Sequence, residues 1–389
     1  MNIKKVISYV LILLVGITLS VGGSMYFRSQ MVDVQTFSQY NNNDFHKAQI
    51  TEIISEADNA DPFSMTTKEV RFKATISSGP YQHKEIVINQ GFNDQLLVAM
   101  YPLSAGDNIM LYRHVVDDIV NYELVSFQRS NQIWLLVGLF VLLIIAFGKM
   151  KGINALISLG FTIYAVFYIL VPAILAQSNL HVLTLLVAFF ITALSFALIG
   201  GLSKKTVSAT LGCVGGMLIA TIIAVLFMVM MRMSGVVSEE FSYLILIQDE
   251  VPINLQGVLF MGIIIGSLGA VMDVAMSISS SLEEIIQNAP SIKPGALIKS
   301  GLNIGKDIMG TMANTLILAY MGGSLSTVLL LIVYGRPMNL LIHSEYIASE
   351  VLQALAGSLG ILFTIPVTAI VSALLMHKKT TSTNQPSAT

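Results

Sequence analysis

Charge and cysteine are both scarce in this sequence. Only 11% of its 389 residues are Asp, Glu, Lys or Arg, and 54% are hydrophobic. An average soluble domain is about 25% charged. Cys213 is the only cysteine, which excludes an intramolecular disulfide and a cysteine-rich metal site. A net charge of −2 gives no indication of a nucleic-acid partner. The low charge and a mean hydropathy of +0.74 together indicate a protein embedded in the lipid bilayer.

The common catalytic motifs are also missing. The sequence has no Walker A pattern, no HExxH and no GxSxG. Intramembrane aspartyl proteases carry two aspartates in YD and GxGD motifs, but here Met272 precedes Asp273, and Gly305 and Lys306 precede Asp307. We therefore expect no enzymatic activity, no cofactor and no resident metal.

Apolar runs of spanning length recur along the chain. A transmembrane helix needs about 20 mostly apolar residues, because the hydrocarbon core is about 30 Å thick. We predict a polytopic α-helical membrane protein of about eight transmembrane helices, the first at the N-terminus. The other predicted spans are 133–148, 153–176, 180–202, 206–231, 256–280, 309–333 and 350–375.

The N-terminal segment 1–27 begins as a cleaved signal peptide does, with Lys4 and Lys5 ahead of an apolar run. It has no convincing small-x-small cleavage site beyond the weak SVGGS at 20–24. We therefore favour an uncleaved signal anchor.

Residues 28–131 differ from the rest because they contain no apolar run near spanning length. Short alternating stretches recur between turn signals, and period-2 alternation is typical of strands. Five such strands favour a small closed β-barrel of the OB or SH3 kind, which leaves no exposed strand edge. The predicted strands are 47–53, 69–77, 84–90, 108–115 and 122–128.

Lysine placement predicts the orientation of the spans, because cytoplasmic loops carry an excess of Lys and Arg. We expect both termini in the cytoplasm, residues 28–131 outside it, a seven-helix membrane domain at 132–377 and a disordered cytoplasmic tail at 378–389. The inner segments then carry Lys4, Lys5, Lys149, Lys151, Lys204, Lys205, Lys293, Lys299, Lys306, Lys378 and Lys379.

An aspartate in the predicted span 256–280 is the first candidate functional residue. At helical spacing, small and polar residues share one face of this span, and Leu268, Val271 and Ile278 lie on the other. We expect the small and polar face to point toward protein or a cavity rather than lipid. Its members are Gly262, Gly266, Gly269, Ala270, Asp273, Ser277 and Ser280.

The next span and its approach carry a similar stripe of polar residues. An antiparallel pair of helices would bring both stripes to the inner half of the membrane. Gly322 and Gly323 also interrupt the apolar run of this span, as in a discontinuous helix or a plain kink. The second stripe consists of Asn303, Asp307, Gly310, Thr311 and Asn314.

Two kinds of role fit these stripes. Carboxylates with hydroxyl and amide oxygens bind hard cations, and a desolvated aspartate can carry a proton. Both point to an ion- or proton-coupled transporter. The structural alternative is that Asp273 pairs with Lys299 or Lys306, or caps the connecting helix. A third small-residue face, with Gly212, Gly216 and Ala220, is interpreted as helix packing.

Two stretches resemble the YibE/F family of bacterial multipass membrane proteins: GSLGAVMDVAMSISSSLEEI and GLNIGKDIMGTMANTLILAYMGGSL. The resemblance covers about 135–376, and the N-terminal anchor with its outer β-domain is similar to the longer, YibE-type arrangement. It implies a bacterial cell membrane and a YibF-like membrane subunit as partner. It supplies no substrate and no functional residues.

Two functions remain open from the sequence. The spans and the polar stripes favour a transporter or permease component that moves an ion or small solute. The alternative is a membrane-anchored sensor or assembly factor that acts through the β-domain.

Overall fold

The structure is a computed structural model that describes residues 3–31, 44–58, 68–92, 102–116, 119–237, 239–246, 252–335 and 337–376. Contacts divide the chain into two compact units. One unit comprises Met1–Val32 and Ile144–Thr389, and the other Asp33–Leu143. The predicted tail at 378–389 lies outside the described residues.

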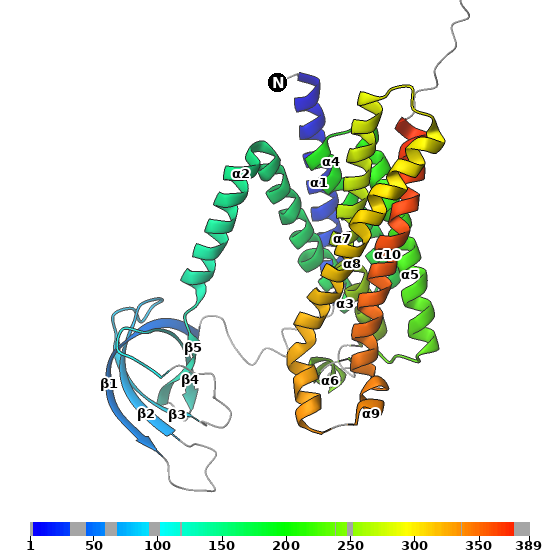
Figure 1. The fold of residues 1–389 in the computed structure, drawn as a ribbon. Coiled ribbons are helices and arrows are strands. Elements are labelled where there is room, and N and C mark those ends of the chain that lie inside the picture. Colours follow the sequence, from blue (N-terminus) through cyan, green and yellow to red (C-terminus); the bar gives the residue numbers. More distant parts are fainter. Residues whose placement is uncertain are drawn as a thin grey trace, which may run out of the picture. The chain divides into compact units, whose positions relative to one another are not determined.

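The smaller unit contains a five-stranded antiparallel sheet in the order β3-β2-β1-β4-β5, which confirms the five predicted strands (Figure 1). The alternation of apolar and polar residues explains why these segments form strands, since in β2 every second residue from Val70 to Ile76 is buried. The sheet packs around a single apolar core that includes Ile50, Phe72 and Ile109. The strands are β1 Phe45–Asp58, β2 Lys68–Ile76, β3 Glu85–Phe92, β4 Asn108–Val116 and β5 Ile119–Phe127.

The two outermost strands of this order, β3 and β5, approach each other as a closing barrel requires. The backbone N–H of Leu124 in β5 donates to Gln90 Oε1 in β3 over 2.9 Å. No strand pairing joins β3 to β5 among the described residues. A side-chain hydrogen bond, and not a ladder of backbone hydrogen bonds, therefore links the two strands whose pairing would complete the predicted barrel.

The larger unit is helical, and α4, α5, α7, α8 and α10 run side by side in it (Figure 1). The N-terminal helix packs on this unit too: Arg28 lies over the ring of Tyr168 at 5.0 Å, and Tyr9 donates to Asn154 over 3.1 Å. The helices are α1 Ile3–Gln30, α2 Ser130–Ala165, η3 Val166–Leu170 (a π-helical turn), α3 Val171–Leu175, α4 Leu180–Gly200, α5 Lys204–Met230, α6 Glu239–Leu246, α7 Leu255–Asn288, α8 Pro294–Val333, α9 Met338–Ile342 and α10 Glu345–Met376.

Seven helical segments among the described residues are long and apolar enough to cross a membrane, against the eight predicted. The difference lies in Ser130–Leu175, which forms one run where the sequence predicted two spans. Lys149 interrupts this run with a non-helical backbone at φ 48° and ψ −128°. Gly152 packs against the carbonyl of Ile144, where a Cβ has no room.

Close packing of α5 on α10 forms the centre of the helical unit. Gly212 contacts Thr368 and Gly216 contacts Thr364 so closely that a Cβ on either glycine would overlap with the threonine. The predicted packing role of this small-residue face is therefore confirmed. Both threonines are fully buried, and Thr364 Oγ1 donates to the carbonyl of Gly360 over 2.7 Å.

Candidate functional site

The predicted polar face of α7 is exposed on the surface of this chain. Asp273 and Ser277 are exposed, and so are three glycines earlier in α7 on the same face: Gly262, Gly266 and Gly269. Ser280, one turn beyond Ser277, is half-buried.

The opposite, apolar face of α7 is the buried one. Leu268, Val271 and Ile278 belong to the central core cluster, together with residues of α4, α5, α8 and α10. Within this chain, neighbouring side chains meet the small and polar face at Gly262 and Gly266, whereas Asp273 and Ser277 are exposed. The apolar face has larger side chains, and these fill the space between the helices, where the unit gains most from packing.

The second polar stripe, on α8, is exposed as well. Asn303, Asp307, Thr311 and Asn314 all lie on the surface of the chain. The helix is also continuous through Gly322 and Gly323, so the first of the two alternatives for these glycines, a discontinuous helix, is absent.

The two stripes do not converge. Helix α8 turns Gly301 and Gly305 toward Ala369 and Ile365 of α10, and it turns Tyr320 toward Gly266 of α7. At helical spacing, the α8 stripe lies on the side away from these contacts. The helices are neighbours, as predicted, but Asp273 and Asp307 form no common cluster in this structure.

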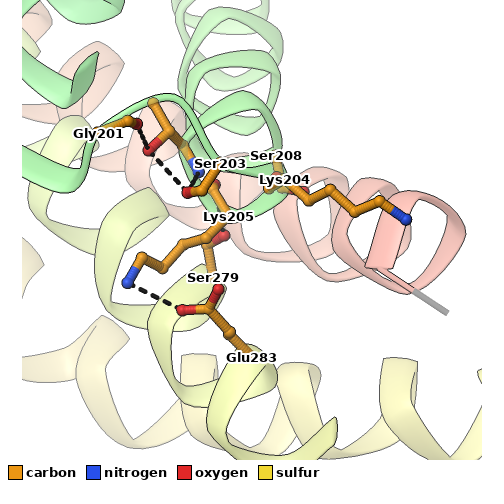
Figure 2. Close-up of polar contacts among 8 residues, drawn as sticks. Gly201, Ser203, Lys204, Lys205, Ser208, Ser279 and Glu283 are labelled. Carbon is orange, nitrogen blue, oxygen red and sulfur yellow. Dashed lines mark hydrogen bonds and ion pairs between the residues drawn. The ribbon is translucent and has the colours of Figure 1, made fainter. Parts of the chain in front are cut away.

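The lysine alternative for Asp273 is not realised among the described residues, where neither Lys299 nor Lys306 forms an ion pair with it. The paired carboxylate of α7 is Glu283, whose Oε2 lies 2.9 Å from Lys205 Nζ of α5 (Figure 2). Ser279 Oγ, one turn earlier, donates to the Lys205 carbonyl over 2.8 Å.

Lys205 lies in the first turn of α5, and local hydrogen bonds explain why the helix starts there. Ser203 caps α5 by accepting from the N–H of Thr206, and Thr206 Oγ1 donates to the carbonyl of Gly201 over 2.6 Å (Figure 2). Gly201 has φ +70°, a conformation that favours glycine. These contacts fix the turn between α4 and α5.

A polar cluster that the sequence analysis missed lies at the other end of the α7 stripe. There Tyr320 of α8 meets Gly266 of α7, and Gln353 of α10 meets Gly262. Glu350 lies one turn before Gln353 on α10, and Ser324 Oγ donates to the Tyr320 carbonyl. Glu350 is half-buried, and the hydroxyl of Tyr320 is buried. A signal was present in the sequence, because Glu350 is a carboxylate at the first residue of the predicted span 350–375.

Long apolar helices with polar faces, beside a small antiparallel sheet, define a polytopic integral membrane protein. The chain belongs to the YibE/F-like protein family, whose sequence model matches residues 136–378. The match confirms the resemblance and covers most of the helical unit, from within α2 to the end of α10. No curated protein and no solved structure matches the chain.

Proposed function

We propose that this protein is a transporter or permease component that moves an ion or a small solute, with the stripes of Asp273 and Asp307 as its ion or proton site. The observation that carries the proposal is Asp273. It lies on a helix of spanning length, on a face of small residues, and none of the described residues pairs with it.

An aspartate at this position has a cost that calls for a function. An Asp at the centre of a transmembrane helix costs about 2.5–3.5 kcal/mol on insertion scales. Glu283 on the same helix shows how this chain neutralises a carboxylate, with a lysine at 2.9 Å. The lack of such a partner at Asp273 supports a carboxylate that exchanges a proton or a cation.

The exposure of both stripes supports a partner that covers them. Polar groups facing lipid are unfavourable, whereas small residues allow a second helix to approach closely. We propose a YibF-like membrane subunit as this partner, and an ion path between the two subunits. We propose no catalytic step and no cofactor.

The topology that we propose has eight spans in a bacterial cell membrane, with both termini cytoplasmic and the β-domain outside. The break at Lys149 supports two crossings within Ser130–Leu175, since about 46 helical residues would extend about 69 Å, more than twice the hydrocarbon core. The contacts of α1 with Tyr168 and Asn154 favour an anchor that is retained.

The test is proton flux into proteoliposomes that contain a pH-sensitive dye, with and without the partner subunit. We expect flux with wild-type protein and at least a tenfold loss in Asp273→Asn. Glu283→Gln is the matched control, because it removes a carboxylate from the same helix off the stripe. Unchanged flux in Asp273→Asn would remove this residue from the mechanism.

The β-domain offers a second candidate function, that of a sensor or assembly factor. A cavity of about 570 Å³ lies between β3 and β5, with mostly polar lining. Two buried atoms there, Tyr122 Oη and His114 Nδ1, have no hydrogen-bond partner among the described residues. The polar side chains of the lining are Arg71, Asn89, Gln90, His114, Asn121, Tyr122 and Glu123.

Deleting residues 40–128 discriminates between the two functions. A transporter core retains some proton flux without the β-domain. A sensor or assembly factor loses its cellular response entirely, and substitutions of Arg71 and Asn89 at the cavity weaken that response without changing flux.

A further inference from the structure

We infer that Glu350 and Tyr320 form a second proton-carrying site on the α7 stripe, toward the start of α7, and that protons pass between this site and Asp273 along the stripe. The inference rests on the proposed function. It adds Glu350 and Tyr320 to the proposed proton path and places that path along the polar face of α7.

Two glycines of α7 place the new site on the stripe. A Cβ on Gly266 would overlap with the hydroxyl of Tyr320, so this phenol lies directly against the α7 backbone. One turn nearer the start of α7, a Cβ on Gly262 would lie 3.4 Å from Gln353 Nε2. The small residues therefore leave room that polar side chains of α8 and α10 occupy.

Tyr320 carries the most unusual group of the site. Its hydroxyl is buried and has no hydrogen-bond partner among the described residues. A buried hydroxyl without a partner is unfavourable, so the position calls for a water or a transferred proton. A phenol can accept a proton on its oxygen while it releases its own, which suits a relay.

Glu350 supplies the titratable carboxyl. It is half-buried and lies one turn before Gln353 on α10, and Gln353 is the residue that meets Gly262. Across from α10, Ser324 Oγ of α8 donates to the Tyr320 carbonyl over 2.8 Å. Gln353 and the Tyr320 hydroxyl therefore meet α7 one turn apart, at Gly262 and Gly266, and Glu350 is the carboxyl next to Gln353 on α10. None of the described residues forms an ion pair with it.

The new site and Asp273 lie at different depths of the same helix face. From Gly262 to Asp273 the helix rises about 16 Å, which is about half of a hydrocarbon core of about 30 Å. Between Gly266 and Asp273 the rise is about 10 Å, too far for a direct transfer. Gly269 lies in this interval, and a Cβ there would meet nothing within 4 Å, which leaves space for bridging water.

The composition of the path favours a proton over a metal ion. Hard cations such as Ca²⁺ take six to eight oxygen ligands, usually with several carboxylates. No group of three or more His, Cys, Asp or Glu side chains gathers among the described residues. A relay needs one carboxyl at each station, and each transfer protonates one oxygen while another is deprotonated, so the charge is conserved.

The experiment measures proton uptake by proteoliposomes for wild type, Glu350→Gln, Tyr320→Phe and Asp273→Asn. We expect the flux of Glu350→Gln to be at least tenfold lower than that of wild type. Tyr320→Phe keeps the ring against Gly266, and we expect its flux to be severalfold lower. Glu345→Gln is the matched control, because Glu345 begins the same helix and binds Ser234 and Gly235 instead. This control keeps wild-type flux.

The outcomes separate the inference from the proposed function. Flux that is lost in Asp273→Asn but kept in Glu350→Gln and Tyr320→Phe overturns the inference alone. No flux with wild-type protein in the presence of the YibF-like partner subunit overturns both. A second readout is labelling with dicyclohexylcarbodiimide, an apolar reagent for protonated carboxyls. We expect mass spectrometry to find the label on Asp273 and Glu350 but not on Glu345, and label on Asp273 without Glu350 contradicts the relay.

Discussion

The contact between α5 and α10 is sensitive to a single methyl group at Gly216. In Gly216→Ala the new Cβ would overlap with Thr364 Oγ1 and lie 2.8 Å from the carbonyl oxygen of Gly360. Ordinary contact begins at 3.4 Å, so the α10 backbone must retreat by at least about 0.6 Å to relieve the Gly360 contact, and Thr364 must shift further. Thr364 cannot rotate away freely, because its hydroxyl donates to Gly360 over 2.7 Å.

Overpacking of this kind costs typically about 1–3 kcal/mol. The matched control is Gly269→Ala on α7, where a Cβ would meet nothing within 4 Å. Both variants share the gain of up to about 1 kcal/mol when alanine replaces glycine in a helix. The difference in unfolding free energy between the two variants therefore isolates the packing cost.

The assay uses the single cysteine. Cys213 is fully buried and lies within one turn of Gly216 on α5. Its rate of reaction with a maleimide in detergent reports how often this part of the bundle opens. We expect labelling about 5- to 150-fold faster in Gly216→Ala than in Gly269→Ala, since every 1.4 kcal/mol is tenfold. Equal rates in the two variants would refute the packing that the structure shows.

Three further predictions concern other contacts. Glu283→Gln costs about 0–1 kcal/mol, because the ion pair with Lys205 is partly exposed, and the Cys213 labelling rate stays near wild type. Gln90→Ala removes the acceptor of the Leu124 N–H, which costs about 0.5–1.5 kcal/mol and speeds hydrogen exchange at Leu124. Burial raises the pKa of Tyr122 above its usual 10.0, so its contribution to β-domain stability is complete below about pH 10 and is lost as pH rises through the folded-state value. Circular dichroism against pH should show that loss in wild type and a smaller one in Tyr122→Phe.

Local patterns in the sequence were sufficient to predict the β-domain strands and the α5 packing face. Alternation of buried and exposed residues, as in Val70 and Phe72, depends only on the strand backbone. The spacing of Gly212 and Gly216 likewise allows close approach whichever helix is the partner. The family match at 136–378 confirms the resemblance that the α7 and α8 stretches carried.

Features that depend on which helices meet could not be predicted. Helical spacing separates the Asp273 face of α7 from the Leu268 face, but it does not say which of the two faces the neighbouring helices cover. By contrast, the break at Lys149 within Ser130–Leu175 lies between the predicted spans 133–148 and 153–176. Glu350 was missed because its role follows from contacts with α8, which are distant in sequence.

The central claim is that Asp273 exchanges a proton or cation for transport. The most direct measurement is proton uptake by proteoliposomes with wild type, Asp273→Asn and Glu283→Gln, each checked for folding by Cys213 labelling. We expect flux in wild type and in Glu283→Gln, and at least a tenfold loss in Asp273→Asn. Equal flux in all three folded proteins would contradict it.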